Sequence, residues 1–173
     1  MKVLFIGGTG NISTAVSRLA VASGIELYLL NRGHRKVDIP GVCEIHADIA
    51  DTGAVREAIR GHQWDCVADF IAFTPDQIKR DFDLFKDNTK QYIFISSASI
   101  YQKPPTQHII TESTPLCNPY WQYSRDKIAC EELLNTYYRE QGFPITIVRP
   151  SHTYDTVIPT AVCGWDDYTL IDG

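Results

Sequence analysis

Tyr123 and Lys127 are the residues whose types and spacing best suit proton transfer. They stand four apart within residues 120–140, a stretch that predicts a long helix, so the two side chains share one helix face. A tyrosine exchanges protons poorly at neutral pH because its ordinary pKa is about 10, and a neighbouring ammonium lowers that pKa by stabilising the phenolate. The pair therefore predicts an acid–base tyrosine tuned by a lysine. The alternative is two unrelated residues on an exposed helix face.

Ser97 is a further hydroxyl expected near this pair. It follows the apolar stretch 91–95, which predicts a strand, and ligands of open α/β folds bind at the carboxyl ends of such strands. Its hydroxyl can bond a substrate oxygen whose charge changes during hydride transfer. Lys127, one turn from Tyr123, can also reach a ribose hydroxyl of a cofactor. A glycine-rich turn, a serine, and then a tyrosine and a lysine follow one another in the order that this chemistry needs.

The glycine-rich turn near the start of the chain predicts a diphosphate site. Residues 3–6 are consecutive apolar residues, which predict a strand buried on both faces, and a helical pattern begins at Ile12. Gly7 permits the sharp turn between them, and Gly10 lets a ligand approach the backbone because no Cβ intervenes. Backbone N–H groups and the helix dipole then face the turn, although two glycines also occur in βα turns for steric reasons alone. Ser13 replaces the third glycine of the usual spacing and is small enough to preserve helix–strand packing.

The end of the predicted second strand, 25–30, indicates the type of cofactor. An acid about 20 residues past the glycines would hold the ribose 2′-hydroxyl of NAD. This position holds Asn31, followed by Arg32. No carboxylate repels a 2′-phosphate there, and a guanidinium can pair with one, so the sequence favours NADP slightly over NAD. The alternative is that Arg32 and Arg35 are solvated loop charges.

Strands and helices alternate along the chain. After the first strand, helix and second strand, strands are expected at 42–47, 65–72, 91–95 and 145–148, and helices at 52–58, 75–85 and 120–140. The alternation predicts an α/β fold, a doubly wound parallel sheet of the Rossmann type in a three-layer α/β/α arrangement. The polar loop 102–119 has a length that is uncommon unless it is functional. Residues 156–173 show no clear period and are too few for a second domain.

Composition excludes several classes of function. The 173 residues are 44% hydrophobic with a net charge of −5, which suits one globular domain with a core. Scattered lysines and arginines argue against nucleic acid as a partner, and no apolar run approaches the ~20 residues of a membrane helix. The cysteines are odd in number and widely spaced, which predicts buried thiols, no metal site and a cytoplasmic location. They are Cys43, Cys66, Cys117, Cys130 and Cys163.

Several motifs together resemble those of the extended short-chain dehydrogenase/reductase family, the NAD-dependent epimerase/dehydratases. The matching segments are Gly7-Gly8-Thr9-Gly10-Asn11-Ile12, Asp48-Ile49, Phe70-Ile71-Ala72, Ser96-Ser97-Ala98-Ser99-Ile100-Tyr101, Tyr123-Ser124-Arg125-Asp126-Lys127 and Arg149-Pro150. The resemblance implies an NAD(P)-binding Rossmann domain at 1–155 and the start of a truncated substrate-binding region at 156–173. Family members run to about twice this scale, so the C-terminal substrate lobe is expected to be largely absent.

The resemblance also implies roles for individual residues. Tyr123 would be the acid–base, Lys127 its tuner and a ribose ligand, and Ser97 the hydroxyl partner. Gly7, Gly10, Asn11 and Ile12 would hold the diphosphate, and Asp48 and Ile49 would flank the adenine. Phe70, Ile71 and Ala72 would line the adenosine side, and Pro150 would lie near the nicotinamide. Thr9, and Asn31 and Arg32 at the end of the second strand, are also expected to bind the cofactor. His152 and Ser99 would touch the substrate, with a merely capping or polar histidine as the alternative for His152.

One departure narrows the expected reaction. Sugar-nucleotide 4,6-dehydratases of this type carry Asp-Glu directly after the active-site serine or threonine, where this chain has Ala98 and Ser99. Without those acids, epimerisation or reduction is favoured over elimination. We therefore expect an NAD(P)-dependent epimerase or reductase acting on a nucleotide-sugar or a similar carbonyl/alcohol substrate. The resemblance further implies a homodimer formed through the helices that flank the fifth strand.

Two other functions remain open at this point. The first is a non-catalytic NAD(P)-binding sensor, or a fragment without its substrate lobe. The second rests on Asn31-Arg32-Gly33, which looks like the turn of some RNA-associated relatives. The acidic net charge argues against that second reading.

Overall fold

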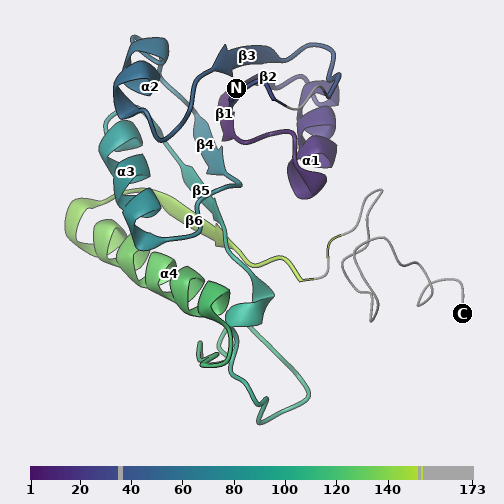
Figure 1. Cartoon of the computed structure of the whole chain (residues 1–173), viewed down its shortest axis with the longest axis vertical. Helices are drawn as coiled ribbons and strands as arrows, with labels where there is room; N and C mark the ends of the chain where they lie inside the picture. Colours follow the sequence, from purple (N-terminus) through teal and green to yellow (C-terminus); the bar gives the residue numbers. More distant parts are fainter. Residues whose placement is uncertain (35–36, 152, 154–173) are drawn as a thin grey trace, which may run out of the picture.

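The apolar run at the start of the chain becomes a central strand of a parallel sheet (Figure 1). The computed structural model describes residues 1–34, 37–151 and 153. The strand order is β3-β2-β1-β4-β5-β6, and every neighbouring pair is parallel. The strands are β1 (Lys2–Ile6), β2 (Glu26–Asn31), β3 (Cys43–His46), β4 (Cys66–Asp69), β5 (Tyr92–Ile95) and β6 (Ile145–Val148).

Helices cover the sheet on both faces. Helix α1 (Asn11–Ala22) lies on one face, and α2 (Thr52–Ala58), α3 (Pro75–Phe85) and α4 (Gln122–Gln141) lie on the other (Figure 1). Alternate residues of β1 enter the two cores, because successive strand side chains point to opposite faces. Val3 packs in the cluster that holds Ala20 of α1, while Leu4 packs in the cluster that holds Phe82 of α3 and Leu134 of α4. The predicted three-layer, doubly wound architecture is confirmed.

The link from β4 to α3 is fixed by local polar contacts. Thr74 precedes the helix in extended conformation, and Pro75 occupies its first turn, where its missing N–H is no loss. The Gln77 side chain accepts hydrogen bonds from the backbone N–H groups of Phe73 at 2.6 Å and Thr74 at 3.2 Å. This cap sets the direction in which the chain leaves the carboxyl end of β4.

The structure adds one element that the sequence did not predict. After β5 the chain forms a short 3₁₀ turn, η1 (Ala98–Ile100), capped by the Ser97 side chain, which accepts a hydrogen bond from the Ser99 N–H. Three residues are too few to show a helical period, which is why only an irregular exit was expected there. The loop 102–119 projects below the sheet in Figure 1 and is anchored at Tyr101, which pairs with Leu116. Residues 156–173 lie outside the described part of the chain.

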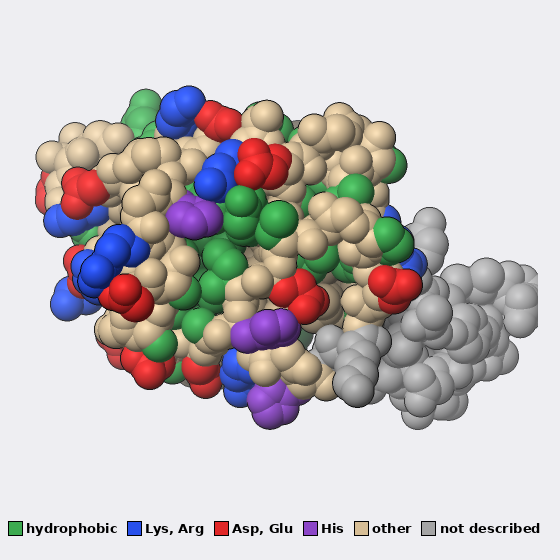
Figure 2. All heavy atoms as spheres, turned by 90° about the horizontal axis from the view of Figure 1, so that it is seen from above, with side chains coloured by type: hydrophobic (Ala, Val, Ile, Leu, Met, Phe, Trp, Pro, Cys, Tyr) green, Lys and Arg blue, Asp and Glu red, His purple; other side chains and the backbone are tan. Residues whose placement is uncertain are grey.

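Charged side chains are mixed over the face shown in Figure 2. Acidic and basic groups alternate there, with no continuous basic area. Within the described residues, no helix is long and apolar enough to cross a membrane.

Candidate functional site

A pocket of about 590 Å³ opens at the carboxyl edge of the sheet, where the strand order reverses between β1 and β4. Open α/β sheets bind ligands at such switch points. Most of the residues predicted to hold a cofactor line this pocket. They are Gly7, Thr9, Gly10, Asn11, Ile12, Asn31, Arg32, Asp48, Ile49, Phe70 and Ile71. Ala72, Lys127 and Pro150 are not part of this lining.

The turn between β1 and α1 leaves no room for a side chain at Gly7. This glycine has a φ of +107°, and a Cβ there would lie 3.0 Å from the Ile71 side chain. Its N–H donates to the Leu30 carbonyl at 3.0 Å, which ties the turn to β2. The positive φ therefore favours glycine at this position, in line with the sharp turn predicted there.

Ser13 caps the helix that starts at the pocket. Its buried hydroxyl accepts a hydrogen bond from the Gly10 N–H at 2.8 Å. The serine in place of a third glycine thus satisfies one of the open N–H groups of the helix start. The N–H groups of Asn11 and Ile12, in the first turn, have no intrahelical carbonyl to bond, and both residues line the pocket. This end of the pocket therefore presents the N–H groups of a helix start, which are donors suited to an anionic group.

Charges around the pocket also suit an anionic ligand. Asn31 accepts a hydrogen bond from the Gly33 N–H at 2.7 Å, and this turn brings Arg32 and His34 to the pocket lining. Asp48 is the carboxylate of the lining, and one of its oxygens accepts from the Ala50 N–H at 3.0 Å. The end of β2 itself presents no acid to the pocket.

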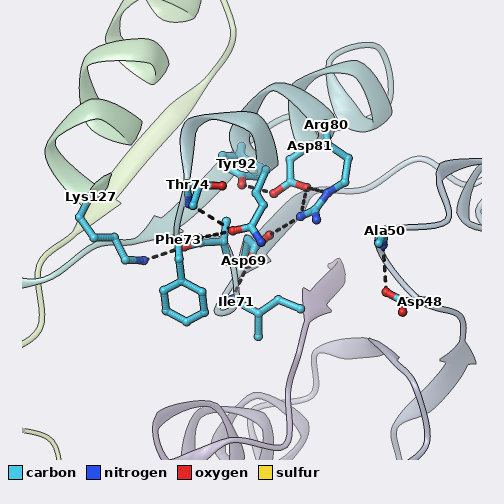
Figure 3. Close-up of polar contacts among 12 residues, drawn as sticks. Asp48, Ala50, Asp69, Ile71, Phe73, Thr74, Arg80, Asp81, Tyr92 and Lys127 are labelled. Atoms are coloured by element: carbon cyan, nitrogen blue, oxygen red, sulfur yellow. Dashed lines mark hydrogen bonds and ion pairs between the residues drawn. The ribbon is translucent and has the colours of Figure 1, made fainter. Parts of the chain in front are cut away.

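Sequence reasoning missed the residues that α3 contributes. Gln77 and Arg80 line the pocket from this helix. Arg80 pairs with Asp81, and Arg80 Nη2 lies 3.7 Å from Asp69 Oδ2 (Figure 3). Asp69 was detectable in principle, because a carboxylate at the end of the buried strand 66–69 needs partners. Nothing in the sequence pattern identified those partners.

Lys127 is buried at the carboxyl ends of β4 and β5. Its Nζ donates to the carbonyls of Ala72 and Ile95, both at 2.7 Å, and it lies 4.6 and 4.5 Å from the ring centroids of Phe73 and Phe94. Burial lowers the pKa of this ammonium from 10.5 to about 8. The lysine therefore joins the turn after β4 to the end of β5.

Tyr123 lies beside Lys127 but is not acidified by it in the free chain. Lys127 Nζ is 5.7 Å from the Tyr123 ring centroid. Burial raises the pKa of Tyr123, and a hydrogen bond with Ser97 lowers it by less, so the net shift is upward. The expected lowering of this pKa is therefore wrong for the free chain, because burial dominates and the ammonium bonds two carbonyls.

A set of hydroxyl groups holds Ser97 next to Tyr123. Ser97 Oγ donates to Ser99 Oγ at 2.9 Å, and Ser124 Oγ of α4 donates to the same oxygen at 2.9 Å. Asn118 Nδ2 donates to the Ser99 carbonyl at 2.7 Å. Ser99, predicted to touch the substrate, thus supports Ser97. The roles of Asn118 and Ser124 carried no sequence signal.

The remaining predicted residues follow β6. The Pro150 carbonyl accepts a hydrogen bond from the Ala98 N–H at 2.9 Å, which places this proline beside η1. Arg149 pairs with Glu131 of α4 at 3.1 and 2.7 Å. His152 lies outside the described residues. In the described part of the chain, no group of three His, Cys, Asp or Glu side chains could hold a metal ion.

The model of the NAD dependent epimerase/dehydratase family matches residues 3–156 of this chain. A UDP-glucose 4-epimerase of Lactobacillus helveticus is 31% identical over 169 residues, which cover 86% of this chain and 51% of that protein. The chloroplast stem-loop binding protein of 41 kDa b of Arabidopsis thaliana is 24% identical, covering 99% of this chain and 47% of that protein. The chain thus spans about half the length of these relatives.

Solved structures agree on the fold. The UDP-glucose 4-epimerase of Brucella ovis, crystallised in complex with NAD, superimposes with a TM-score of 0.76 at 21% sequence identity. The match covers 86% of this chain and 51% of that protein.

The buried ammonium of Lys127 predicts a pH-dependent stability. Between its pKa of about 8 in the folded chain and 10.5 in the unfolded chain, the unfolded chain holds a proton that the folded chain has released. The contribution of this residue to the free energy of unfolding therefore rises with pH across that window, by up to about 3 kcal/mol. Urea unfolding at pH 7 and 10.5 should show this rise in the wild type relative to Lys127→Met. Parallel changes in the two proteins would contradict it.

Proposed function

Because this chain belongs to the NAD dependent epimerase/dehydratase family, we propose that it binds a nicotinamide dinucleotide and supports epimerisation or reduction with Tyr123 as the acid–base. The observation that carries the proposal is a juxtaposition. The pocket at the β1–α1 turn and the group Ser97, Tyr123 and Lys127 lie on the same edge of the sheet. The turn 70–73 joins them, since Ile71 lines the pocket and the Ala72 carbonyl accepts a hydrogen bond from Lys127.

The residues of the pocket fit the parts of such a cofactor. The first turn of α1, at Asn11 and Ile12, would hold the diphosphate with its open N–H groups and helix dipole. Asp48 and Ile49 would flank the adenine. When bound, the nicotinamide ring would accept a hydride from the substrate carbon or return it.

The hydroxyl groups of the chain would handle the proton. Tyr123 would take the proton of a substrate hydroxyl, or give one to a carbonyl oxygen, as the hydride moves. Ser97, whose oxygen accepts from the Ser99 N–H, would turn its hydroxyl hydrogen from Ser99 Oγ to the same oxygen and stabilise its developing charge. Lys127 would bind the cofactor ribose, one turn of α4 away from Tyr123.

The proposed substrate class is a nucleotide-sugar or a similar carbonyl/alcohol. Support comes from the relative named UDP-glucose 4-epimerase, which is 31% identical. Ala98 and Ser99, next to Ser97, bring no carboxylate that could assist the elimination of water. Epimerisation or simple reduction is therefore proposed over dehydration.

The proposal includes a slight preference for NADP. Arg32 and His34 line the pocket at the end of β2, where an NAD site would present an acid to the ribose. A guanidinium there can pair with a 2′-phosphate.

We also place the protein in the cytoplasm, acting on a small molecule rather than on nucleic acid or membrane, and as a homodimer through the helices that flank β5. The free thiols of the four cysteines in the described residues support a reducing compartment. Cys66 and Cys130 are buried as predicted, whereas Cys43 and Cys117 are exposed, so the expectation of a buried thiol is wrong for those two. The acidic net charge of −5 weighs against nucleic acid.

Tyr123→Phe should lower turnover by about 10²–10⁴-fold, because it removes only the proton-exchanging hydroxyl. Turnover would be followed on a panel of UDP- and dTDP-sugars, and cofactor affinity by the fluorescence of NADPH. Tyr138→Phe, on the exposed part of the same helix, is the matched control and should keep full activity. Unchanged turnover in Tyr123→Phe would refute the proposed role. Cofactor binding without any turnover in the wild type would favour the sensor.

Arg32→Ala should weaken NADP binding about tenfold and leave NAD binding unchanged, since only NADP carries the phosphate that the guanidinium would pair with. Titration of both cofactors by calorimetry measures the ratio. Arg18→Ala, an exposed arginine of α1 outside the pocket lining, is the control. Equal discrimination in Arg32→Ala and the wild type would remove Arg32 from the cofactor site.

A further inference from the structure

A line of polar contacts runs from β5 to Lys127 behind the cofactor pocket. Figure 3 shows Asp69, at the carboxyl end of β4, between Lys127 on one side and Arg80 and Asp81 of α3 on the other. Both carboxyl groups are fully buried. A buried carboxylate must have partners in the fold, because the loss of its hydration is otherwise uncompensated.

Asp69 shapes the turn that joins the two halves of the site. Its Oδ1 accepts hydrogen bonds from the backbone N–H groups of Ile71 at 2.5 Å and Ala72 at 2.7 Å. Two N–H donors on one oxygen suit a charged carboxylate. With those groups fixed, the Ile71 side chain lines the pocket and the Ala72 carbonyl accepts from Lys127.

Arg80, Asp81 and Tyr92 bond one another on the Oδ2 side of Asp69. Asp81 Oδ1 accepts from Arg80 Nε at 2.9 Å and Nη2 at 2.7 Å, and Asp81 Oδ2 accepts from the Tyr92 hydroxyl at 2.7 Å. Asp69 Oδ2 has no hydrogen-bond partner in the described residues and faces Arg80 Nη2 at 3.7 Å. Burial, and then the charge of Asp69, raise the pKa of Asp81 well above its ordinary value.

Asp69 is also the anion that acts most effectively on Lys127. Three groups favour the charged form of this lysine, namely Cys130, Asp69 and Glu131. Burial raises the pKa of Cys130 to about 12, so its thiol is neutral where Lys127 titrates. Glu131 is neutralised by its paired contacts with Arg149. Asp69 is therefore the remaining anion that can favour the charged form of Lys127. Its charge is only weakly offset, because Arg80 Nη2 lies 3.7 Å away.

We propose that Asp69 is a positioning residue of this site, which shapes the 70–73 turn and supplies the negative charge opposite the Lys127 ammonium. Arg80, which Asp81 holds, is the cation facing its second oxygen, at 3.7 Å. The inference rests on the proposed function only for the role of Lys127 in binding the cofactor ribose. The contacts of Asp69 exist in the free chain.

The test is the titration of Lys127 in the free chain. The protein is labelled with ¹³Cε,¹⁵Nζ-lysine, the Lys127 signal is assigned with Lys127→Arg, and its titration is followed by NMR in the wild type and in Asp69→Asn. The asparagine keeps an oxygen for Ile71 and Ala72 but removes the charge. We expect the Lys127 midpoint, about 8 in the wild type, to fall by about 0.5 pH unit or more, because an opposite charge favours the ammonium.

Asp81→Asn is the matched control, since Asp81 lies in the same buried group but is not among the groups that favour the charged form of Lys127. It should leave the Lys127 midpoint within about 0.2 pH unit of the wild type. An unchanged midpoint in Asp69→Asn, or an equal fall in both variants, would overturn the proposal. If Asp69→Asn does not fold, the wild type still decides. The Ile71 and Ala72 amide nitrogens should show scalar coupling across their hydrogen bonds to the Asp69 carboxyl carbon, and absence of that coupling would contradict the proposal.

The outcome is separable from that of the proposed function. A Lys127 titration midpoint that does not fall in Asp69→Asn would contradict the positioning role even if Tyr123→Phe abolished turnover. Full activity of Tyr123→Phe would contradict the catalytic proposal, but it would not change the expected effect of Asp69→Asn on the Lys127 midpoint.

Discussion

The burial of the Lys127 ammonium is the constraint on which the rest of the site depends. An ammonium removed from water needs hydrogen-bond acceptors at short range. Here they are the carbonyls of Ala72 and Ile95, both at 2.7 Å, with the faces of Phe73 and Phe94 completing its surroundings. The two carbonyls belong to the exits of neighbouring strands, so the lysine fixes α4 to the carboxyl edge of the sheet.

Other parts of the site follow from that attachment. Because α4 is held there, Tyr123 is placed against Phe73 and Ser97, and Ser124 reaches Ser99. The turn after β4 serves both halves, since the same few residues line the pocket and bind the lysine. The pocket itself depends on β1, whose strand ends in a turn that only glycine can make at Gly7.

Most of the fold could be predicted from sequence patterns that span only a few residues. The apolar run of β1, the helix start at Pro75 and the alternation of strands and helices each reflect interactions within a few residues, so the sequence alone located them. The glycine turn between β1 and α1 was predictable for the same reason. Contacts between distant segments were not predictable. Arg80 reaches the pocket only because α3 packs beside β4, and Asn118 reaches Ser99 across a long loop.

The Tyr123 pKa shows the same limit of local patterns. Helical spacing correctly put the lysine next to the tyrosine, but it could not reveal how deeply both would be buried or that two carbonyls would bind the ammonium. Burial outweighs the neighbouring charge in the free chain, so the pKa of Tyr123 rises.

A crystal structure of the chain with bound NADP tests the central claim most directly. We expect density for the diphosphate over the turn from Gly7 to Ile12, and for the nicotinamide ring beside the Tyr123 hydroxyl, with Lys127 within hydrogen-bonding distance of the ribose. A dinucleotide bound away from that turn, or a Tyr123 hydroxyl pointing into solvent far from the ring, would contradict it.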